Sequence, residues 1–212
     1  KRGYSLQRTY ALSKLESAIM PAIQVGLLVL VVTAPAFIFF SQKGPGAMHA
    51  PWLISLAAGL VVGGLSQYSR LCTVGGFRDL FLFKKSVLIF GYIAVLVGVF
   101  AVNVSFGNFH LGFENQPISH TDGLWNFLGM ALAGFCSVLL GGCPLRQLIM
   151  TGEGNSDSAV TVLGLAAGAA FAHNFGLAAS GAGPTLNGQI AVGIGFVVAL
   201  IIAVLNTKRS NA

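Results

Sequence analysis

The sequence predicts an all-α, polytopic membrane protein with about six membrane segments, two of them broken or re-entrant and related by an internal repeat. Of 212 residues, 55% are hydrophobic and only 8% are charged, whereas soluble domains carry roughly 25% charged residues. Apolar runs long enough to cross a bilayer as helices recur along the chain. Two shorter runs end in a glycine pair and are followed by a cysteine.

The positive charge of the chain predicts topology rather than a nucleic-acid partner. The formal net charge is +6, and the twelve Lys and Arg residues gather at the ends of apolar runs. Cytoplasmic loops of membrane proteins carry such an excess of Lys and Arg. A nucleic-acid-binding protein would instead show a basic face on a soluble fold. We therefore expect a lipid bilayer around the chain and no nucleic acid.

The N-terminal part predicts an arm and a first membrane span. Residues 1–17 are basic and suit a cytoplasmic or interfacial arm, or else a solvated linker. Residues 18–40 form the first apolar run, with Pro21 in its first turns and Pro35 as a late kink. We expect the transport domain to cover residues 18–206, before a cytoplasmic tail at 207–212.

Two repeat units follow, at about 52–106 and 125–179. Each unit predicts a short helix, a break that carries a cysteine, and a second helix. The connection at 107–123 contains no Lys or Arg, so it is expected outside, with both chain ends in the cytoplasm. The expected helices are 52–66, 77–83, 86–106, 125–140, 159–179 and 189–205, with Ser156 or Asp157 as the N-cap of the helix at 159–179.

Three short stretches match between the two units. Ala58-Gly59-Leu60 corresponds to 133–135, the pair at 63–64 to that at 141–142, and residues 77–80, which contain Arg78, to residues 145–148, which contain Arg146. Paired, glycine-interrupted segments point to a transporter's binding site, because broken helices direct their terminal N–H groups at an anion.

The second break has the chemistry of a helix start. Pro144 suits the first helical position, which makes Cys143 the N-cap. A helix N-terminus favours the thiolate and apolar surroundings favour the thiol, so the sequence leaves both forms open. A thiol donates a weak S–H bond to a soft anion, whereas a thiolate attacks a disulfide-like substrate.

The cysteines, arginines and glycines at the breaks are the candidate substrate-binding residues. No metal site and no cofactor is predicted. Of the further candidates, Arg70 is equally explained as a positive-inside residue, and Cys136 is better explained by core packing than by a pathway role. His173 and Asn174 would be costly inside a membrane helix, which indicates a function, or else they form an interhelical hydrogen bond. The binding candidates are Cys72, Cys143, Arg78, Arg146, Gly75, Gly76, Gly141 and Gly142.

The motifs RLCTVGGFRD at residues 70–79 and GGCPLR at residues 141–146 resemble those of the YeeE/YedE family of sulfur-transport membrane proteins. The second motif, with GEGN at 152–155, is similar to the YedE-type branch assigned to selenium transport. The likeness covers residues 53–180 and fits the C-terminal half of longer members. It implies a bacterial inner-membrane fold with helices dipping in from both sides. It also implies passage of thiosulfate along pathway cysteines, a role that Cys72 and Cys143 inherit by motif.

Transport of a small inorganic sulfur or selenium compound is the function that this resemblance implies. The alternative is a membrane relay that binds sulfur or selenium covalently on a thiol and hands it to a cytoplasmic sulfur- or selenium-handling protein. A structural subunit would leave the repeat unexplained. No GxxxxGK[ST] motif occurs, which argues against ATP hydrolysis by this chain. We expect a transporter and not an enzyme.

Overall fold

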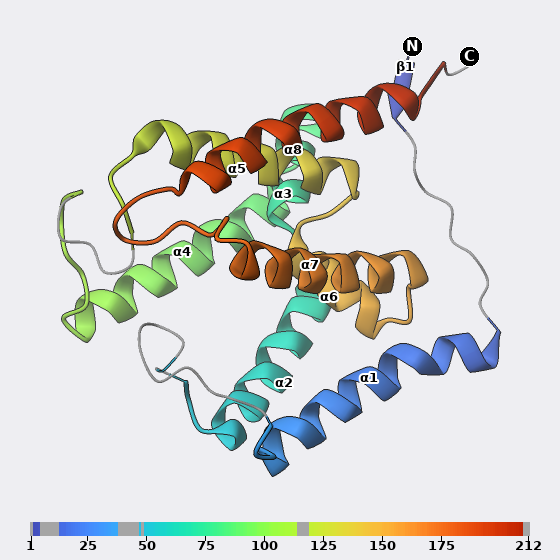
Figure 1. Ribbon diagram of the computed structural model, residues 1–212, viewed down its shortest axis with the longest axis vertical. Helices are drawn as coiled ribbons and strands as arrows, with labels where there is room; N and C mark the ends of the chain where they lie inside the picture. The colour runs from blue at the N-terminus through green and yellow to red at the C-terminus, as the bar shows by residue number, and fades with distance from the viewer. Residues whose placement is uncertain (1, 5–12, 38–46, 48, 114–118, 210–212) are drawn as a thin grey trace.

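The computed structural model describes residues 2–4, 13–37, 47, 49–113 and 119–209, and it is built of helices (Figure 1). One short antiparallel pair of strands, β1 (Arg2–Tyr4) and β2 (Thr207–Arg209), joins the two ends of the chain. The predicted all-α class is confirmed. The helices are α1 (Lys14–Thr33), α2 (Trp52–Ser69), α3 (Thr73–Phe83), α4 (Val87–Ser105), α5 (Gly123–Leu139), α6 (Pro144–Gly152), α7 (Ser156–Asn174) and α8 (Leu186–Leu205).

Four helical segments within the described residues are long and apolar enough to cross a membrane. Two of them, Trp52–Phe83 and Gly123–Gly152, combine a long helix with the short helix after its break. The other two are α4 and α8, each with a mean hydropathy of 2.5. Helices α1 and α7 are not among these four, so the count of six segments stays a prediction.

Helix α1 is shorter than the predicted span of residues 18–40. It contains Pro21 as expected, but it ends at Thr33 and is followed by Ala34 with a φ of 39°. The residue before a proline is disfavoured in the right-handed α region. Pro35 therefore ends the helix at Thr33, with Ala34 already outside it, instead of kinking a longer helix. Residues 38–40 lie outside the described part of the chain.

The two repeat units meet in the middle of the molecule. The first unit consists of α2, α3 and α4, and the second of α5, α6 and α7. Within each unit the short helix packs on the helix that follows it, α3 on α4 and α6 on α7. Across the units α2 contacts α6 and α3 contacts α5. Each short helix therefore also touches the long helix of the other unit, which places α3 and α6 at the centre (Figure 1).

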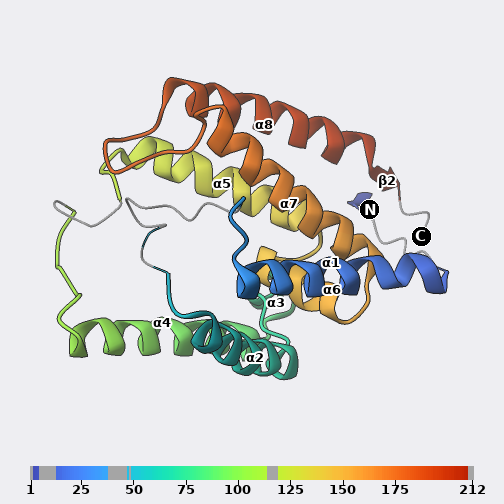
Figure 2. The ribbon, with the colours of Figure 1, turned by 60° about the horizontal axis from the view of Figure 1, so that its bottom comes forward.

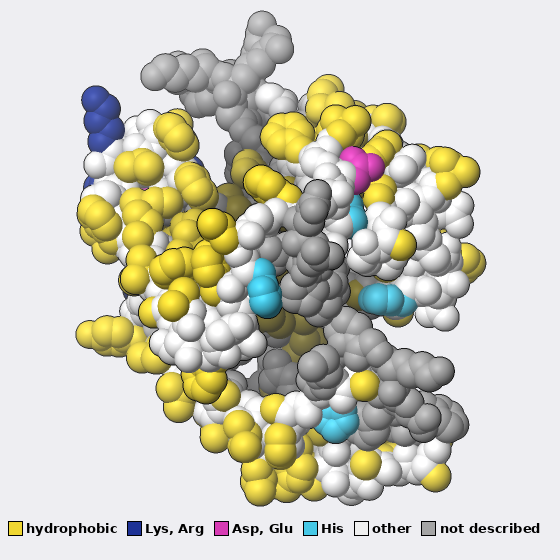
Figure 3. All heavy atoms as spheres, turned by 90° about the vertical axis from the view of Figure 1, so that its left-hand side faces the viewer, with side chains coloured by type: hydrophobic (Ala, Val, Ile, Leu, Met, Phe, Trp, Pro, Cys, Tyr) yellow, Lys and Arg dark blue, Asp and Glu magenta, His cyan; other side chains and the backbone are white. Residues whose placement is uncertain are grey.

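The helices run in alternating directions between two ends of the molecule. In Figure 2, α4 ends and α5 and α8 begin at the left, whereas both chain ends lie at the right. Figure 3 shows the face that contains the left-hand ends: hydrophobic patches, scattered histidines and an acidic side chain are visible on it, and among the described residues in view Lys or Arg lies at one edge. This arrangement fits the predicted outer side, and the orientation itself stays a prediction.

Buried residues are few, and they gather near the two breaks. Only 6% of the apolar window of α4 and of α8 is buried, compared with 22% of the window in Gly123–Gly152. The long helices thus present their apolar faces outward, as lipid requires, while the second broken segment lies deepest. The buried polar residues of the described chain are Ser66, Ser137, Gln147, Thr151 and Ser158.

Candidate functional site

The first break, residues 70–72, follows α2. Helix α2 passes through the glycine pair at 63–64 and continues to Ser69, three residues beyond the predicted end at residue 66. Arg70 takes the left-handed conformation with a φ of 50°, and the N–H of Leu71 donates to the carbonyl of Ser66 at 3.2 Å. Glycines at 63–64 are tolerated inside the helix because intrahelical hydrogen bonds persist without a side chain. The turn at Arg70 makes the break.

The second break, residues 141–143, has the same backbone geometry. Gly141 is left-handed with a φ of 76°, and the N–H of Gly142 donates to the carbonyl of Ser137 at 3.0 Å. Both breaks are Schellman motifs, in which a left-handed residue lets the next N–H reach back to the last helical turn. The residue after each motif is a cysteine, Cys72 or Cys143, and it is the N-cap of the short helix.

These shared hydrogen bonds correct the alignment of the repeat. Residues 63–64 do not correspond to the glycines of the second break, because the left-handed Arg70 occupies the place of Gly141. Arg78 is six residues after its N-cap, whereas Arg146 is only three residues after its own. Counted from the N-caps, Arg146 corresponds to Gly75 rather than to Arg78. Short matching stretches of sequence therefore do not align two repeat units correctly when their breaks differ in sequence.

The two breaks bring two thiols together. The Cys143 thiol interacts with the Cys72 thiol, with the hydroxyl and N–H of Thr73, and with the N–H of Arg146. Cys72 is 8% exposed and Cys143 is 5% exposed, and both are free cysteines. The N-termini of α3 and α6 therefore converge on one buried pair of sulfur atoms. Helix N-termini supply N–H donors and a positive dipole end, which suits an anion.

The two thiols differ in how they are held. Cys72 caps α3 through its side chain, because its Sγ accepts a hydrogen bond from the N–H of Gly75 at 3.2 Å. Cys143 accepts no capping hydrogen bond of this geometry within α6, every residue of which the structure describes. Pro144 at the first position of α6 confirms the predicted helix start. Cys72 is thus held by a capping hydrogen bond, whereas Cys143 has none and interacts mainly with the other repeat unit.

The predicted arginines lie in different environments. The guanidinium of Arg78 bonds Asp79 at 2.8 Å and is 56% exposed. The guanidinium of Arg146 lies 3.5 Å from Glu153 and is 20% exposed. Its Nη1 atom is fully buried and has no hydrogen-bond partner among the described residues. Arg146, on the same helix as Cys143, is thus the better placed cation, while Arg70 is exposed and ends α2.

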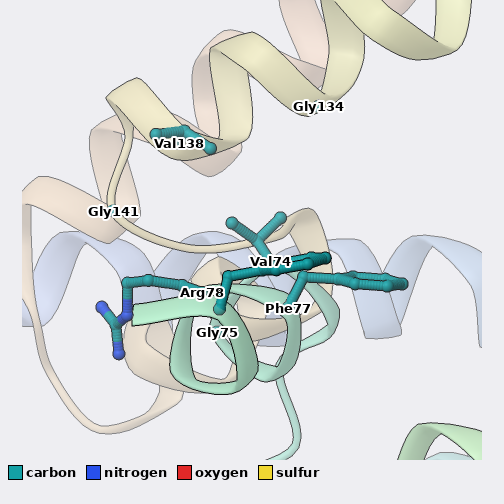
Figure 4. A pocket seen from close by; sticks show the side chains of 8 residues that line it. Val74, Gly75, Phe77, Arg78, Gly134, Val138 and Gly141 are labelled. Carbon is teal, nitrogen blue, oxygen red and sulfur yellow. The ribbon is translucent and has the colours of Figure 1, made fainter. Parts of the chain in front are cut away.

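A pocket of about 350 Å³ lies between α3 and α5, beside the breaks. Figure 4 shows Val74 of α3 pointing toward α5, which carries Val138 and Gly134, with Phe77 extending along α3 and Arg78 extending toward the end where Gly141 turns the chain. Gly75, next to the cysteine pair, also lines it. The walls are apolar, and Arg78 is the charged lining residue, so the pocket suits a soft anion better than a strongly hydrated one.

Among the described residues, the remaining candidates share no hydrogen bond or ion pair with the thiol pair, and their own environments are ordinary. His173 and Asn174 are exposed in the last turn of α7, which ends earlier than predicted, and Asn174 bonds its own helix at Ala170. Cys136 is half-buried within α5. The N-cap of α7 is Asn155 rather than the predicted Ser156 or Asp157, because its side chain accepts from the N–H at 158.

Sequence reasoning missed two residues at the centre. Thr73 meets the Cys143 thiol from the other repeat unit, and Gln147 is 3% exposed and crosses the second break. For Gln147 the sequence did offer a signal: it is a polar residue four positions after a predicted N-cap, in a short apolar helix. Thr73 had none, because its role depends on contact between units. Among the described residues, no three His, Cys, Asp or Glu side chains form a cluster that could hold a metal ion.

Comparison with known proteins places the chain in a family. A model of the family described as sulphur transport matches residues 68–208. The chain is similar to the thiosulfate transporter TsuA of Escherichia coli (strain K12), with 27% identity over 115 residues that cover 50% of this chain and 30% of that protein. No solved structure matches. The chain belongs to the sulphur transport (YeeE/YedE) family of multi-pass membrane proteins.

Proposed function

We propose that this chain forms a pathway through the bacterial inner membrane for a small inorganic sulfur anion of the thiosulfate type, or for its selenium counterpart. The anion would move inward past Cys72 and Cys143. One observation carries the proposal: the two repeat units bring the thiols of their N-cap cysteines within interaction range of each other, at the N-termini of α3 and α6. The similarity to a thiosulfate transporter supports the choice of substrate class.

The chemistry of the thiol pair suits such an anion. Burying a charge away from water is costly unless hydrogen bonds and opposite charge replace its hydration. Here the backbone N–H groups of Thr73 and Arg146 lie at the Cys143 thiol, and neutral thiols donate weak S–H bonds. Weak donors are an advantage in a pathway, because a solute that binds too tightly does not leave.

The other candidates have supporting roles in this proposal. Arg146 supplies positive charge on the helix that Cys143 caps, and its buried Nη1 lies 3.5 Å from the Glu153 carboxylate without a hydrogen bond, so an anion would compete with Glu153 for it. Arg78 supplies a second positive charge at the neighbouring pocket. Gly75 and Gly142 are both buried and leave the backbone beside the thiols without side chains. We assign Arg70, Cys136, His173 and Asn174 no contact with the substrate.

Uptake of thiosulfate labelled with radioactive sulfur tests the proposal. Cells that lack their own importers would express the natural protein, Cys143→Ala or the matched control Cys136→Ala, with membrane expression measured for each. We expect Cys143→Ala to lose at least about 90% of uptake, the scale of one lost anion contact, and Cys136→Ala to retain it. Undiminished uptake by Cys143→Ala at equal expression would contradict the proposal.

Competition experiments identify the substrate. Unlabelled thiosulfate, selenite and sulfate are added to the same uptake assay at equal concentration. We expect thiosulfate to compete and sulfate not to, because sulfate lacks the soft terminal sulfur that the thiols recognise. Competition by selenite at equal strength would assign the pathway to the selenium branch instead.

The covalent relay makes a different prediction. There a Cys143 thiolate would attack the outer sulfur of thiosulfate, forming a persulfide and releasing sulfite, and a cytoplasmic protein would then collect the sulfur. Both thiols are buried, which argues against access by a protein partner. Mass spectrometry of the protein after incubation with thiosulfate distinguishes the two, because only the relay adds one sulfur atom to Cys72 or Cys143.

A further inference from the structure

We propose that Gln147 is a positioning residue, which bridges the second break and holds the Cys143 thiol against Thr73 and Cys72. Its Nε2 donates a hydrogen bond to the carbonyl of Leu140 at 2.9 Å, across seven residues of chain. Its consequence for transport rests on the function proposed above, whereas its effect on the thiol pair can be measured without transport.

Gln147 donates hydrogen bonds to residues on both sides of Gly141 and Gly142. Leu140 follows the last residue of α5, where helical carbonyls lose their partners. The backbone N–H of Gln147 donates to the carbonyl of Cys143 at 3.0 Å. Gln147 thus bonds both the residue just before the break and the N-cap residue that ends it. At 3% exposure its amide is shielded from competing water.

The side chain of Gln147 also lies against the break itself. A Cβ atom added to Gly142 would stand 3.6 Å from Nε2 of Gln147. Gly142 directly precedes Cys143, so the amide covers the backbone that carries the thiol. Because Cys143 lacks the capping hydrogen bond that holds Cys72, the orientation of Cys143 depends on this contact.

The first break has no equivalent of this side chain. Four residues after Cys72 stands Gly76, and a Cβ there would lie 3.3 Å from the backbone nitrogen of Ile89. Helix α3 therefore packs directly on the start of α4 at this position, which leaves little room for a larger residue. The first break is secured by its cap and by backbone packing, and the second by Gln147.

Thr151 provides a matched control one turn further along α6. It is also buried, at 7% exposure. Its hydroxyl donates to the carbonyl of Gln147 at 2.8 Å, within the same helix. Replacing Thr151 by valine removes a buried hydrogen bond from α6 without touching the break. A variant at Gln147 that behaves differently from Thr151→Val therefore reports on the hydrogen bond between Gln147 and Leu140, and not only on the stability of α6.

Phenylarsine oxide measures the thiol pair directly. It condenses with two neighbouring thiols, forming two As–S bonds and releasing its oxygen as water, with no change of redox state. The purified protein would carry Cys136→Ser, so that Cys72 and Cys143 are its thiols. We expect Gln147→Leu to slow capture about tenfold, the scale of one lost hydrogen bond to a buried group, and Thr151→Val to leave it unchanged.

A second variant supplies a readout that a structural role would not change. Gln147→Glu keeps the shape, and its carboxyl donates to the Leu140 carbonyl only when protonated. We expect the capture rate of this variant, divided by that of the Cys136→Ser protein at the same pH, to be near one in acid. The ratio should fall as the pH rises and the carboxylate forms.

The outcomes separate the two proposals. Capture by Gln147→Leu at the rate of its parent, or a ratio for Gln147→Glu that does not change with pH, would overturn the positioning role. If Gln147→Leu does not fold, the pH ratio of Gln147→Glu decides alone. Failure of the parent protein to capture the arsenical would overturn it as well. Normal capture without thiosulfate uptake would instead contradict the transport function and leave Gln147 in its role.

Discussion

The two breaks reach the same backbone geometry by different means. At the first, an arginine with a φ of 50° makes the left-handed turn, and Cys72 caps α3 through a hydrogen bond from Gly75. At the second, Gly141 makes the turn, Pro144 starts the helix, and Cys143 has no capping bond within α6. The first cysteine is anchored by its own helix, whereas the second is positioned by its surroundings.

This difference suggests a division of work within the thiol pair. The Cys72 sulfur is committed to capping α3, whereas the Cys143 sulfur makes no capping hydrogen bond and has donors from both units around it. Cys143 also shares its helix with Arg146, whose Nη1 is buried without a hydrogen-bond partner among the described residues. We therefore regard Cys143 as the main solute contact and Cys72 as the fixed wall opposite it. The predictions below test this contrast.

The largest stability effect is expected from Gly141→Val. A left-handed backbone costs an L-residue about 1–2 kcal/mol, and a β-branched side chain is the least tolerated there. We expect the free energy of unfolding to fall by about 2 kcal/mol, measured by thermal unfolding in detergent. Gly98→Val in α4, where an added Cβ meets no atom within 4 Å, is the control. Equal losses at both positions would contradict a requirement for the left-handed turn.

An intermediate effect should separate the two cysteines. Cys72→Ala removes an N-capping acceptor, a change that typically costs about 1 kcal/mol, whereas Cys143→Ala removes none. Both variants lose one sulfur from a buried site, so their difference in free energy of unfolding isolates the cap. We expect Cys72→Ala to be less stable by about 1 kcal/mol and Cys72→Ser to recover most of that. Equal stability of the two alanine variants would show that the breaks are held alike.

The smallest effect is expected from Arg70→Gly. Glycine adopts a positive φ without the penalty that arginine incurs, although it loses more backbone entropy on folding. We expect a net gain of about 0.5 kcal/mol in unfolding free energy. Lys84→Gly, at the other left-handed helix end with a φ of 53°, should give a similar gain. A loss at Arg70 alone would indicate that its side chain contributes contacts beyond ending α2.

Local patterns in the sequence predicted the second break better than the first. A proline directly after a cysteine identified Cys143 as an N-cap, because proline is favoured in the first helical turn. At the first break the cysteine was identified, but the helix end was placed at residue 66 instead of 69, because a glycine pair often marks a break while left-handed arginines are uncommon. Asn155 was overlooked as the N-cap of α7 because the next two residues, Ser156 and Asp157, are equally good capping types.

Composition and hydropathy determined the helical membrane class, since a chain with so few charges has to pair its backbone groups within helices when lipid surrounds it. The motifs at the two breaks indicated the family and named both cysteines. Only the tertiary structure decided that the two thiols interact, that Thr73 and the backbone N–H of Arg146 lie at the Cys143 thiol, and that Gln147 is buried at the second break. Such contacts depend on how two helix ends cross, and neighbours along the chain do not specify that geometry.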